Sequence, residues 1–321
     1  MTPDWLAIIS SPAAVWLLAA LASHYLSSRL QLQPRTAFMW LAKRLAAKVH
    51  PDYSRPAAQQ RLAGGLALLL MLLWPLGIAY GLLMISAWPV MIDILLLFIC
   101  LSWQPYEVQI ARIARLLQQP QLRLARQLAS PLLLRDTDKL SELGLSKALI
   151  ESASLRFASQ YLAIFFWYLL GGALLALTYA LVQAMAQQWS VKLKHNRHFG
   201  LCSAVLYAIG QLPGLWLATF LLLLQSALRN SINALRQSSG GYFRLSQAAL
   251  LRLTSAKLNV RLGGPLFYAQ HKLTRERLQA ANEPTPADIQ RLLRLLRQQQ
   301  WLVLCGCLVV ILLQFVWRAL S

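Results

Sequence analysis

Six stretches of this 321-residue chain are too long and too apolar for a water-soluble core. They cover residues 5–26, 62–85, 87–103, 160–186, 199–227 and 301–319. A helix that crosses a bilayer needs about 20 apolar residues, and lipid-exposed backbone must satisfy its own hydrogen bonds. These runs are too unbroken for barrel strands. The sequence therefore predicts an all-α polytopic membrane protein with about six transmembrane helices.

The first run also has features of a signal peptide. Ala20-Leu21-Ala22 looks like a small-residue cleavage site, but no Lys or Arg precedes Arg29 and the apolar stretch is long. A signal peptide normally carries a basic segment before its apolar one. The first run is therefore predicted to be a retained membrane anchor.

The 31 basic residues, set against 11 acidic ones, predict the orientation of the chain. Seven lie in residues 29–61, eight in 104–159, twelve in 228–300 and three in the link 187–198. Basic connections face the cytoplasm. This places three basic segments on the cytoplasmic side of a bacterial inner membrane. Both termini and the links near Trp88 and Lys192 are placed on the outer side.

The external position of the link 187–198 conflicts with its own charge, because it carries Lys192, Lys194 and Arg197. Two explanations stay open. Either the membrane tolerates these charges outside, or a neighbouring run is re-entrant, with Pro213 as the break.

A net charge of +20 could also indicate nucleic-acid binding. The basic residues are spread over every internal connection, without interleaved aromatic residues, so anionic lipid headgroups explain the charge more simply. Membrane lipids are the predicted partner, and nucleic acid is not. The four cysteines, all within apolar runs, are interpreted as small buried residues; they are Cys100, Cys202, Cys305 and Cys307.

No metal site is predicted, since His195 and His198 give only a weak ligand spacing. Two amphipathic cytoplasmic helices are predicted. One spans Pro34 to Lys48. The other begins at Thr285-Pro286-Ala287-Asp288, with an N-cap residue, a proline and a first-turn acid, and carries a basic stripe expected at the lipid headgroups. We expect one domain covering residues 1–321.

Four of the eleven carboxylates fall in one sixteen-residue window, namely Asp136, Asp138, Glu142 and Glu151. This window is the best functional lead. Two structural interpretations stay open beside it. The segment Asp136-Thr137-Asp138 could begin a helix, and Glu151 could form an exposed pair with Lys147 worth about 0.5 kcal/mol.

Two further features are weighed in the same way. The segment Arg261-Leu262-Gly263-Gly264-Pro265 predicts a turn, whose glycines could also approach a phosphate. Asp93 lies in the short third run, near its external end, where its side chain can reach water.

The order of these fragments resembles the adenosylcobinamide-phosphate synthase family, CobD/CbiB, over residues from about 30 to 319. The resemblance rests on Leu128-Ala129-Ser130, Arg135-Asp136-Thr137, Leu140, Ala148, Glu151-Ser152, Phe165-Phe166, Gly171-Gly172, Tyr179, Lys192, Gly200, Pro213, Leu262-Gly263-Gly264-Pro265, Tyr268 and Asp288-Ile289. It implies a cobalamin-biosynthesis protein of the inner membrane, with ATP-dependent amide ligation of aminopropanol, or its phosphate, to adenosylcobyric acid.

The same resemblance implies Mg and ATP as cofactors, a corrinoid intermediate as ligand, and a set of site residues. The retained polar site would be Arg135, Asp136, Thr137, Glu151 and Lys192. The turn residues near a phosphate would be Arg261, Gly263, Gly264 and Pro265.

Most of the acidic residues of that family are replaced here. The replacements are Leu155-Arg156, Ser159-Gln160, Gln183-Ala184-Met185-Ala186-Gln187-Gln188, Tyr207-Ala208 and Ser23-His24. Magnesium needs hard oxygen ligands, carboxylates above all, so the sequence predicts impaired catalysis.

Two function hypotheses follow. The chain is either a CobD/CbiB-type ligase, active or impaired, or a pseudoenzyme that acts as a membrane sensor or regulator. The second would be comparable to the AmpE branch, which is associated with β-lactamase induction, and would act through a protein partner.

Overall fold

The computed structural model describes the whole chain except residues 1–9, 31–33, 51–54, 120, 134–136, 139, 226–244, 265, 269–270, 274–277, 279–281 and 321. The chain forms two compact units. Unit 1 contains Met1–Gln104, Ala163–Gln211 and Val303–Ser321, and unit 2 contains Pro105–Leu162 and Leu212–Leu302.

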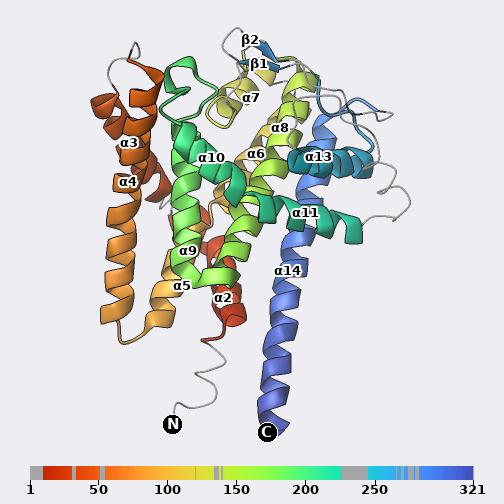
Figure 1. Ribbon diagram of the computed structural model, residues 1–321. Helices are drawn as coiled ribbons and strands as arrows, with labels where there is room; N and C mark the ends of the chain where they lie inside the picture. The colour runs from red at the N-terminus through yellow and green to blue at the C-terminus, as the bar shows by residue number, and fades with distance from the viewer. Residues whose placement is uncertain are drawn as a thin grey trace. The chain divides into compact units, whose positions relative to one another are not determined.

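Helices make up most of both units (Figure 1). Those of unit 1 are α2 (Pro12–Leu30), α3 (Pro34–Val49), α4 (Ala57–Ile85), α5 (Pro89–Cys100), α9 (Ala163–Gln188), the short η2 (Lys194–Asn196) and α10 (Leu201–Gly210). Those of unit 2 are α6 (Trp103–Gln118), α7 (Leu122–Ala129), α8 (Glu142–Phe157), the π-helix η1 (Ala158–Leu162), α11 (Leu212–Leu224) and α13 (Leu245–Leu258). The long helix α14 (Pro286–Leu320) begins in unit 2 and ends in unit 1.

The prediction of an all-α polytopic membrane protein is confirmed, apart from one small antiparallel ribbon. Its strands are β1 (Leu266–Tyr268) and β2 (His271–Leu273), with Leu266 opposite Leu273. Among the described residues, five helical stretches are long and apolar enough to cross a membrane. They are Ala57–Ile85, Pro89–Gln118, Glu142–Gln188, Leu201–Leu224 and Pro286–Arg318.

These five stretches overlap the second to sixth predicted runs, and the third, fourth and sixth runs were predicted too short. The first run overlaps a shorter apolar helix, Pro12–Leu26. Several apolar side chains on the long helices are highly exposed, such as Leu73 (68%), Ile85 (87%) and Trp317 (77%). So much exposed apolar surface is costly in water and suits a lipid environment.

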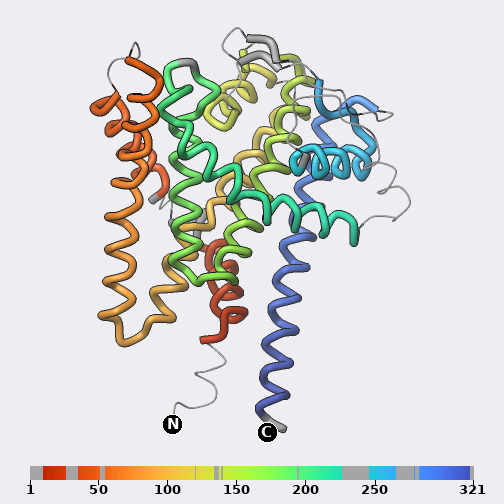
Figure 2. Tube along the Cα trace, viewed as in Figure 1, coloured from red at the N-terminus to blue at the C-terminus, as the bar shows by residue number. Residues whose placement is uncertain are grey.

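Two glycines reverse the chain inside α9. Gly171 (φ −151°, ψ 30°) and Gly172 (φ 69°, ψ −169°) have non-helical backbone angles. Trp167 and Tyr179 are twelve residues apart and would be separated by about 18 Å along a straight helix, yet their ring centroids lie 6.4 Å apart. The positive φ at position 172 favours glycine, which has no Cβ. The run predicted as one crossing at 160–186 is therefore two arms that turn back on each other (Figure 2).

This reversal brings the link after α9 against α3. The Trp189 indole donates to the carbonyl oxygen of Ala42 (3.1 Å). The Nε2 of His50 lies 3.1 Å from the carbonyl oxygen of His195, and its ring stacks on Phe199 at 5.1 Å. The prediction that residues 29–61 and the link 187–198 lie on opposite sides of the membrane is therefore wrong. A straight fourth span would separate them, but a folded one does not.

The fifth run is interrupted next to Pro213, the residue named as a possible break, and Leu201–Leu224 as a whole is still long enough to cross a membrane. Helix α10 ends at Gly210 and α11 begins at Leu212, so Pro213 lies in the first turn of α11. A proline is tolerated there because the first helical N–H groups have no intrahelical acceptor.

Both predicted amphipathic helices are present as α3 and the first turns of α14. The Asp288 carboxyl accepts hydrogen bonds from the Thr285 N–H (2.9 Å) and hydroxyl (2.7 Å), which fixes the start of α14. Among the cysteines, Cys100 and Cys307 are buried, but Cys202 and Cys305 are exposed on apolar helices. The prediction of four buried cysteines is wrong for these two, because helix surfaces that face lipid do not need to be covered by protein.

Candidate functional site

No helix begins at Thr137 or Asp138, the described residues at the start of the acidic window. Helix α8 begins at Glu142, and the Ser141 hydroxyl caps it by accepting from the Gly144 N–H (3.1 Å). Of the predicted site residues here, Arg135 and Asp136 lie outside the described residues. Thr137 is 3% exposed. For the described Thr137 and Asp138, the interpretation as a helix start is therefore wrong, since α8 begins at Glu142 and Ser141 supplies the capping oxygen.

Glu151 is the best-defined member of the predicted site. Its side chain is 2% exposed, and its Oε1 accepts a hydrogen bond from the backbone N–H of Gly263 at 2.8 Å. The interpretation of Glu151 as part of an exposed pair is wrong, because this residue faces the interior of unit 2. Two fragments singled out in the sequence, 112 residues apart, thus meet in space.

The turn that carries Gly263 is shaped by its glycines and by neighbouring backbone bonds. Gly263 and Gly264 have φ of 79° and 91°, in the left-handed region that favours glycine. The Arg261 N–H donates to the carbonyl oxygen of Asn282 (2.8 Å), and the Leu278 N–H donates to that of Leu262 (2.8 Å). These bonds hold the turn so that its N–H points at Glu151.

The other predicted turn residues play different parts. The Arg261 guanidinium pairs with Glu283 at 3.1 Å, and both side chains are 48% exposed. Such a pair contributes no more than about 1 kcal/mol. Pro265 lies outside the described residues. Lys192 is exposed and belongs to unit 1 rather than unit 2.

Polar contacts next to Glu151 tie α8 to its neighbours. The Ser152 and Tyr106 hydroxyls lie 2.7 Å apart. The Arg156 guanidinium lies 4.3 Å over the Tyr106 ring and donates to the carbonyl oxygen of Leu132 (2.8 Å). Sequence reasoning missed Tyr106, whose only signal is a polar aromatic residue at the start of an amphipathic helix. The region around Glu151 is therefore held by side chains from α6 and α8 and by a backbone carbonyl of the segment after α7.

An ion pair between Glu107 and Arg297 was also missed. Glu107 is 1% exposed on α6, whereas the Arg297 side chain on α14 is 52% exposed. The signal in the sequence is an isolated acid in a helix that is otherwise apolar and basic. The pair shows that the basic stripe of α14 does not serve lipid headgroups alone.

A basic depression lies between α13 and α14 in unit 2. It has a volume of about 380 Å³ and is lined by Lys257, Arg291 and Arg294, together with Leu258, Leu295 and Gln298. Arg291 is also paired with Asp288 at 3.1 Å. Three cations around one depression suit an anionic group such as a phosphate or carboxylate.

The fold and these contacts define a polytopic helical membrane protein with a buried carboxyl group held against a glycine turn. The sequence model of the family described as CobD/Cbib protein matches residues 16–296. The chain belongs to the CobD/CbiB family.

Curated relatives agree with this family. The chain is 26% identical to a cobalamin biosynthesis protein CobD of Chromobacterium violaceum over 89% of its own length and 92% of the relative. It is 26% identical to a protein of the same name from Klebsiella pneumoniae, over 74% and 77%. A third, from Clostridium perfringens, is 23% identical over 54% and 57%. No solved structure matches the chain.

The described residues do not fit the magnesium and ATP that the family resemblance implies. Within the part of the chain that the structure describes, no group of three or more His, Cys, Asp or Glu is placed to hold a metal. Where the family resemblance expects acids after Glu151, Ser159 (1% exposed) and Gln160 (2% exposed) are buried and neutral. Magnesium favours carboxylate oxygens and water, and neutral amides are poorer substitutes.

Proposed function

We propose that this chain is a cobalamin-biosynthesis protein of the bacterial inner membrane that binds a corrinoid intermediate but has lost most or all of the family ligase activity. One observation carries the proposal. Glu151, the carboxyl retained from the family pattern, is buried against the Gly263 N–H. It links α8 to the glycine turn, and among the described residues it does not belong to a group of three or more possible metal ligands.

The neutral replacements have structural uses of their own, which supports the loss of catalysis. The Ser159 hydroxyl donates to the carbonyl oxygen of Arg156 at 3.3 Å. In unit 1, Gln183 and Gln187 accept hydrogen bonds from Arg35 at 3.2 and 2.8 Å. Activating a carboxylate with ATP requires metal-held phosphates, and these positions hold protein groups instead.

The basic depression supports continued binding of an anionic ligand. Lys257, Arg291 and Arg294 surround it. Carboxylates and phosphates of the intermediates used by the family are anionic, and guanidinium groups bind both strongly. We therefore expect the purified chain to bind cobyric acid, and Arg294→Met to weaken that binding. Absorbance titration measures it, with Arg123→Met, an exposed position on α7, as the matched control.

Complementation tests the loss of activity. The chain is expressed in cells that lack their own cobinamide-phosphate synthase and are grown on cobyric acid, with the Chromobacterium violaceum relative as the positive control. We expect no growth, despite equal amounts of both proteins in the membrane fraction. Growth that disappears with Glu151→Gln would show an active ligase and refute the proposal.

The AmpE-like hypothesis, like the pathway proposal, expects no catalysis, but it does not expect the chain to bind a corrinoid. If the chain binds no cobyric acid, and its deletion changes β-lactamase induction, the regulatory hypothesis replaces the pathway proposal. If cobyric acid binds and induction is unchanged, the pathway proposal holds.

A further inference from the structure

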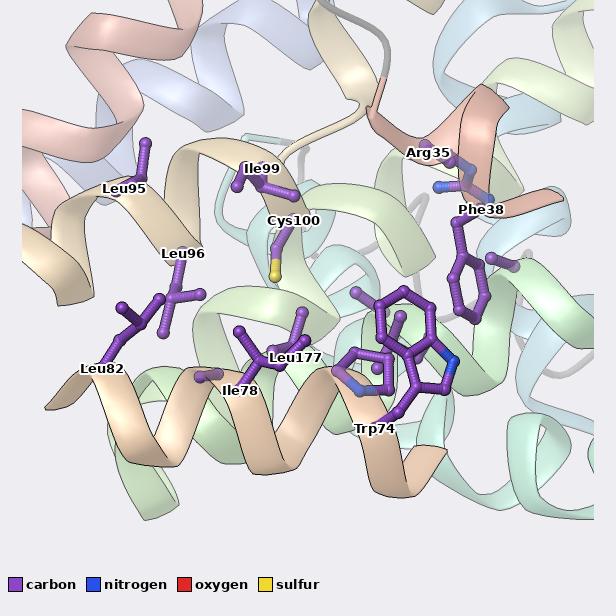
Figure 3. A pocket seen from close by; sticks show the side chains of 15 residues that line it. Arg35, Phe38, Trp74, Ile78, Leu82, Leu95, Leu96, Ile99, Cys100 and Leu177 are labelled. Atoms are coloured by element: carbon purple, nitrogen blue, oxygen red, sulfur yellow. The ribbon is translucent and has the colours of Figure 1, made fainter. Parts of the chain in front are cut away.

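An apolar groove in unit 1 has a single charged residue at one end (Figure 3). Its volume is about 310 Å³, and its walls come from α3, α4, α5 and α9. Among the described residues that line it, Arg35 is the only charged one, and the others are apolar, such as Phe38, Trp74 and Leu96. The volume is at the lower end of the range for small-molecule sites, which is about 300–1,000 Å³.

Arg35 is held in place by three neutral acceptors. Its Nη1 donates to the Ser102 hydroxyl and to Gln183 Oε1 (3.2 Å), and its Nη2 donates to Gln187 Oε1 (2.8 Å). Hydroxyl and amide oxygens orient the guanidinium plane. An oriented guanidinium at the end of an apolar groove is suited to contact a phosphate oxygen.

The groove is long enough to hold much of a lipid acyl chain. In Figure 3, Arg35 and Phe38 lie at one end, and Leu82 and Leu95 lie at the other. Along α4, the wall from Trp74 to Leu82 covers eight steps of the helical rise, or about 12 Å. The hydrocarbon core of a bilayer is about 30 Å thick, so one leaflet measures about 15 Å. The wall therefore spans most of one leaflet.

We propose that this groove binds one acyl chain of an anionic phospholipid, with the lipid phosphate held by Arg35. Three of the four helices that form it belong to the candidate membrane spans. The charge lies at the end that also holds the basic α3 helix, where anionic headgroups of the cytoplasmic leaflet would gather. The proposal is independent of the corrinoid function, because all of its residues lie in unit 1.

Lipid titration of the full-length chain tests the proposal. The chain is purified and delipidated in a neutral detergent, and binding is measured by native mass spectrometry. The probes are phosphatidylglycerol, phosphatidylcholine with the same acyl chains, and glycerol 3-phosphate, which has no chain. We expect phosphatidylglycerol to bind about tenfold more tightly than phosphatidylcholine, because both lipids carry a phosphodiester but the choline ammonium offsets its charge and is repelled by Arg35.

Three variants distinguish binding of the lipid headgroup from binding of the acyl chain. Arg35→Met keeps the apolar stem but removes the charge, so it should weaken the binding of both lipids and abolish the preference for phosphatidylglycerol. Ala180→Phe fills the groove and should weaken binding of both lipids by about tenfold. Arg44→Met is the matched control, because Arg44 lies on the same helix but stacks over Trp40 at 4.0 Å, outside the groove.

Several results would overturn the proposal. A preference that survives in Arg35→Met, or falls equally in Arg44→Met, would remove Arg35 as the headgroup site. Glycerol 3-phosphate binding as tightly as phosphatidylglycerol would indicate a free phosphate ligand. Unchanged lipid binding in Ala180→Phe would exclude the groove, and this variant decides the question even if Arg35→Met fails to fold.

Discussion

Replacing Glu151 with alanine removes the side chain that joins α8 to the glycine turn. The Gly263 N–H, which donates to Glu151 at 2.8 Å, would then be buried without its acceptor, at a cost of about 1–3 kcal/mol. The substitution also removes one buried methylene group, worth about 0.8 kcal/mol. We expect the free energy of unfolding to fall by about 2–4 kcal/mol. Glu151→Gln keeps an acceptor oxygen of the same shape, so its loss should stay near 1 kcal/mol.

Unfolding in mixed micelles with increasing sodium dodecyl sulfate measures these differences, followed by the fluorescence of the eleven tryptophans. Glu142→Gln is the control. Glu142 lies in the first turn of the same helix and is exposed, so its loss should cost only about 0.3–1 kcal/mol through the helix dipole. If Glu151→Ala destabilises the chain no more than Glu142→Gln, Glu151 is not a structural link between α8 and the glycine turn. The argument that this carboxyl group has a structural role instead of a catalytic one then fails.

Three further results are expected. Gly172→Ala should destabilise the chain by about 1–3 kcal/mol, because φ is 69° while the space around a new Cβ is open; the same micelle titration measures this, and no change would contradict the reversal. Arg297→Met should cost about 3–5 kcal/mol by leaving the buried Glu107 uncompensated, whereas Glu107→Gln should cost less because Arg297 is half exposed; equal losses would contradict this asymmetry. In a chain whose four cysteines are replaced, Lys48→Cys and Lys192→Cys should react with a membrane-impermeant maleimide from the same side, and labelling from opposite sides would refute the corrected topology.

The membrane helices could be predicted from sequence because their signal is local. A run of apolar residues needs no knowledge of what packs against it, and the exposed Leu73 and Ile85 show that much of this surface faces away from protein. The start of α14 is local for the same reason, since Thr285 and Asp288 are three residues apart and cap the helix together. Each of these features depends on contacts within a few turns of one helix.

The reversal at Gly171-Gly172 could not be found in the same way. Hydropathy is identical whether an apolar helix continues or folds back, and glycine is common within membrane helices. The decisive contact joins Trp167 to Tyr179 across the turn. The sequence held one indirect signal, which was the conflict between the basic link 187–198 and its predicted external side.

The meeting of Glu151 with Gly263 was likewise beyond local reasoning. Each fragment had a simpler local explanation, either a surface pair for Glu151 or a plain turn for the glycines. Only the long-range packing of unit 2 shows that the Gly263 N–H donates a hydrogen bond to the Glu151 carboxyl group. Their common presence in the family resemblance was the one signal that linked them, and it could not give their geometry.

The reversal also changes how charge and topology agree. With one straight fourth span, Lys192 and Arg197 would face the side opposite to the basic α3 helix. Because the chain folds back, the link that carries them packs on α3 through Trp189 and Ala42. Basic residues from both segments then gather at one end of unit 1, as the positive-inside tendency favours. Arg35 lies at that same end, bonded to Ser102, Gln183 and Gln187. A surface that concentrates positive charge beside an apolar groove will attract anionic lipid, so the folded span that corrects the topology also creates the proposed lipid site.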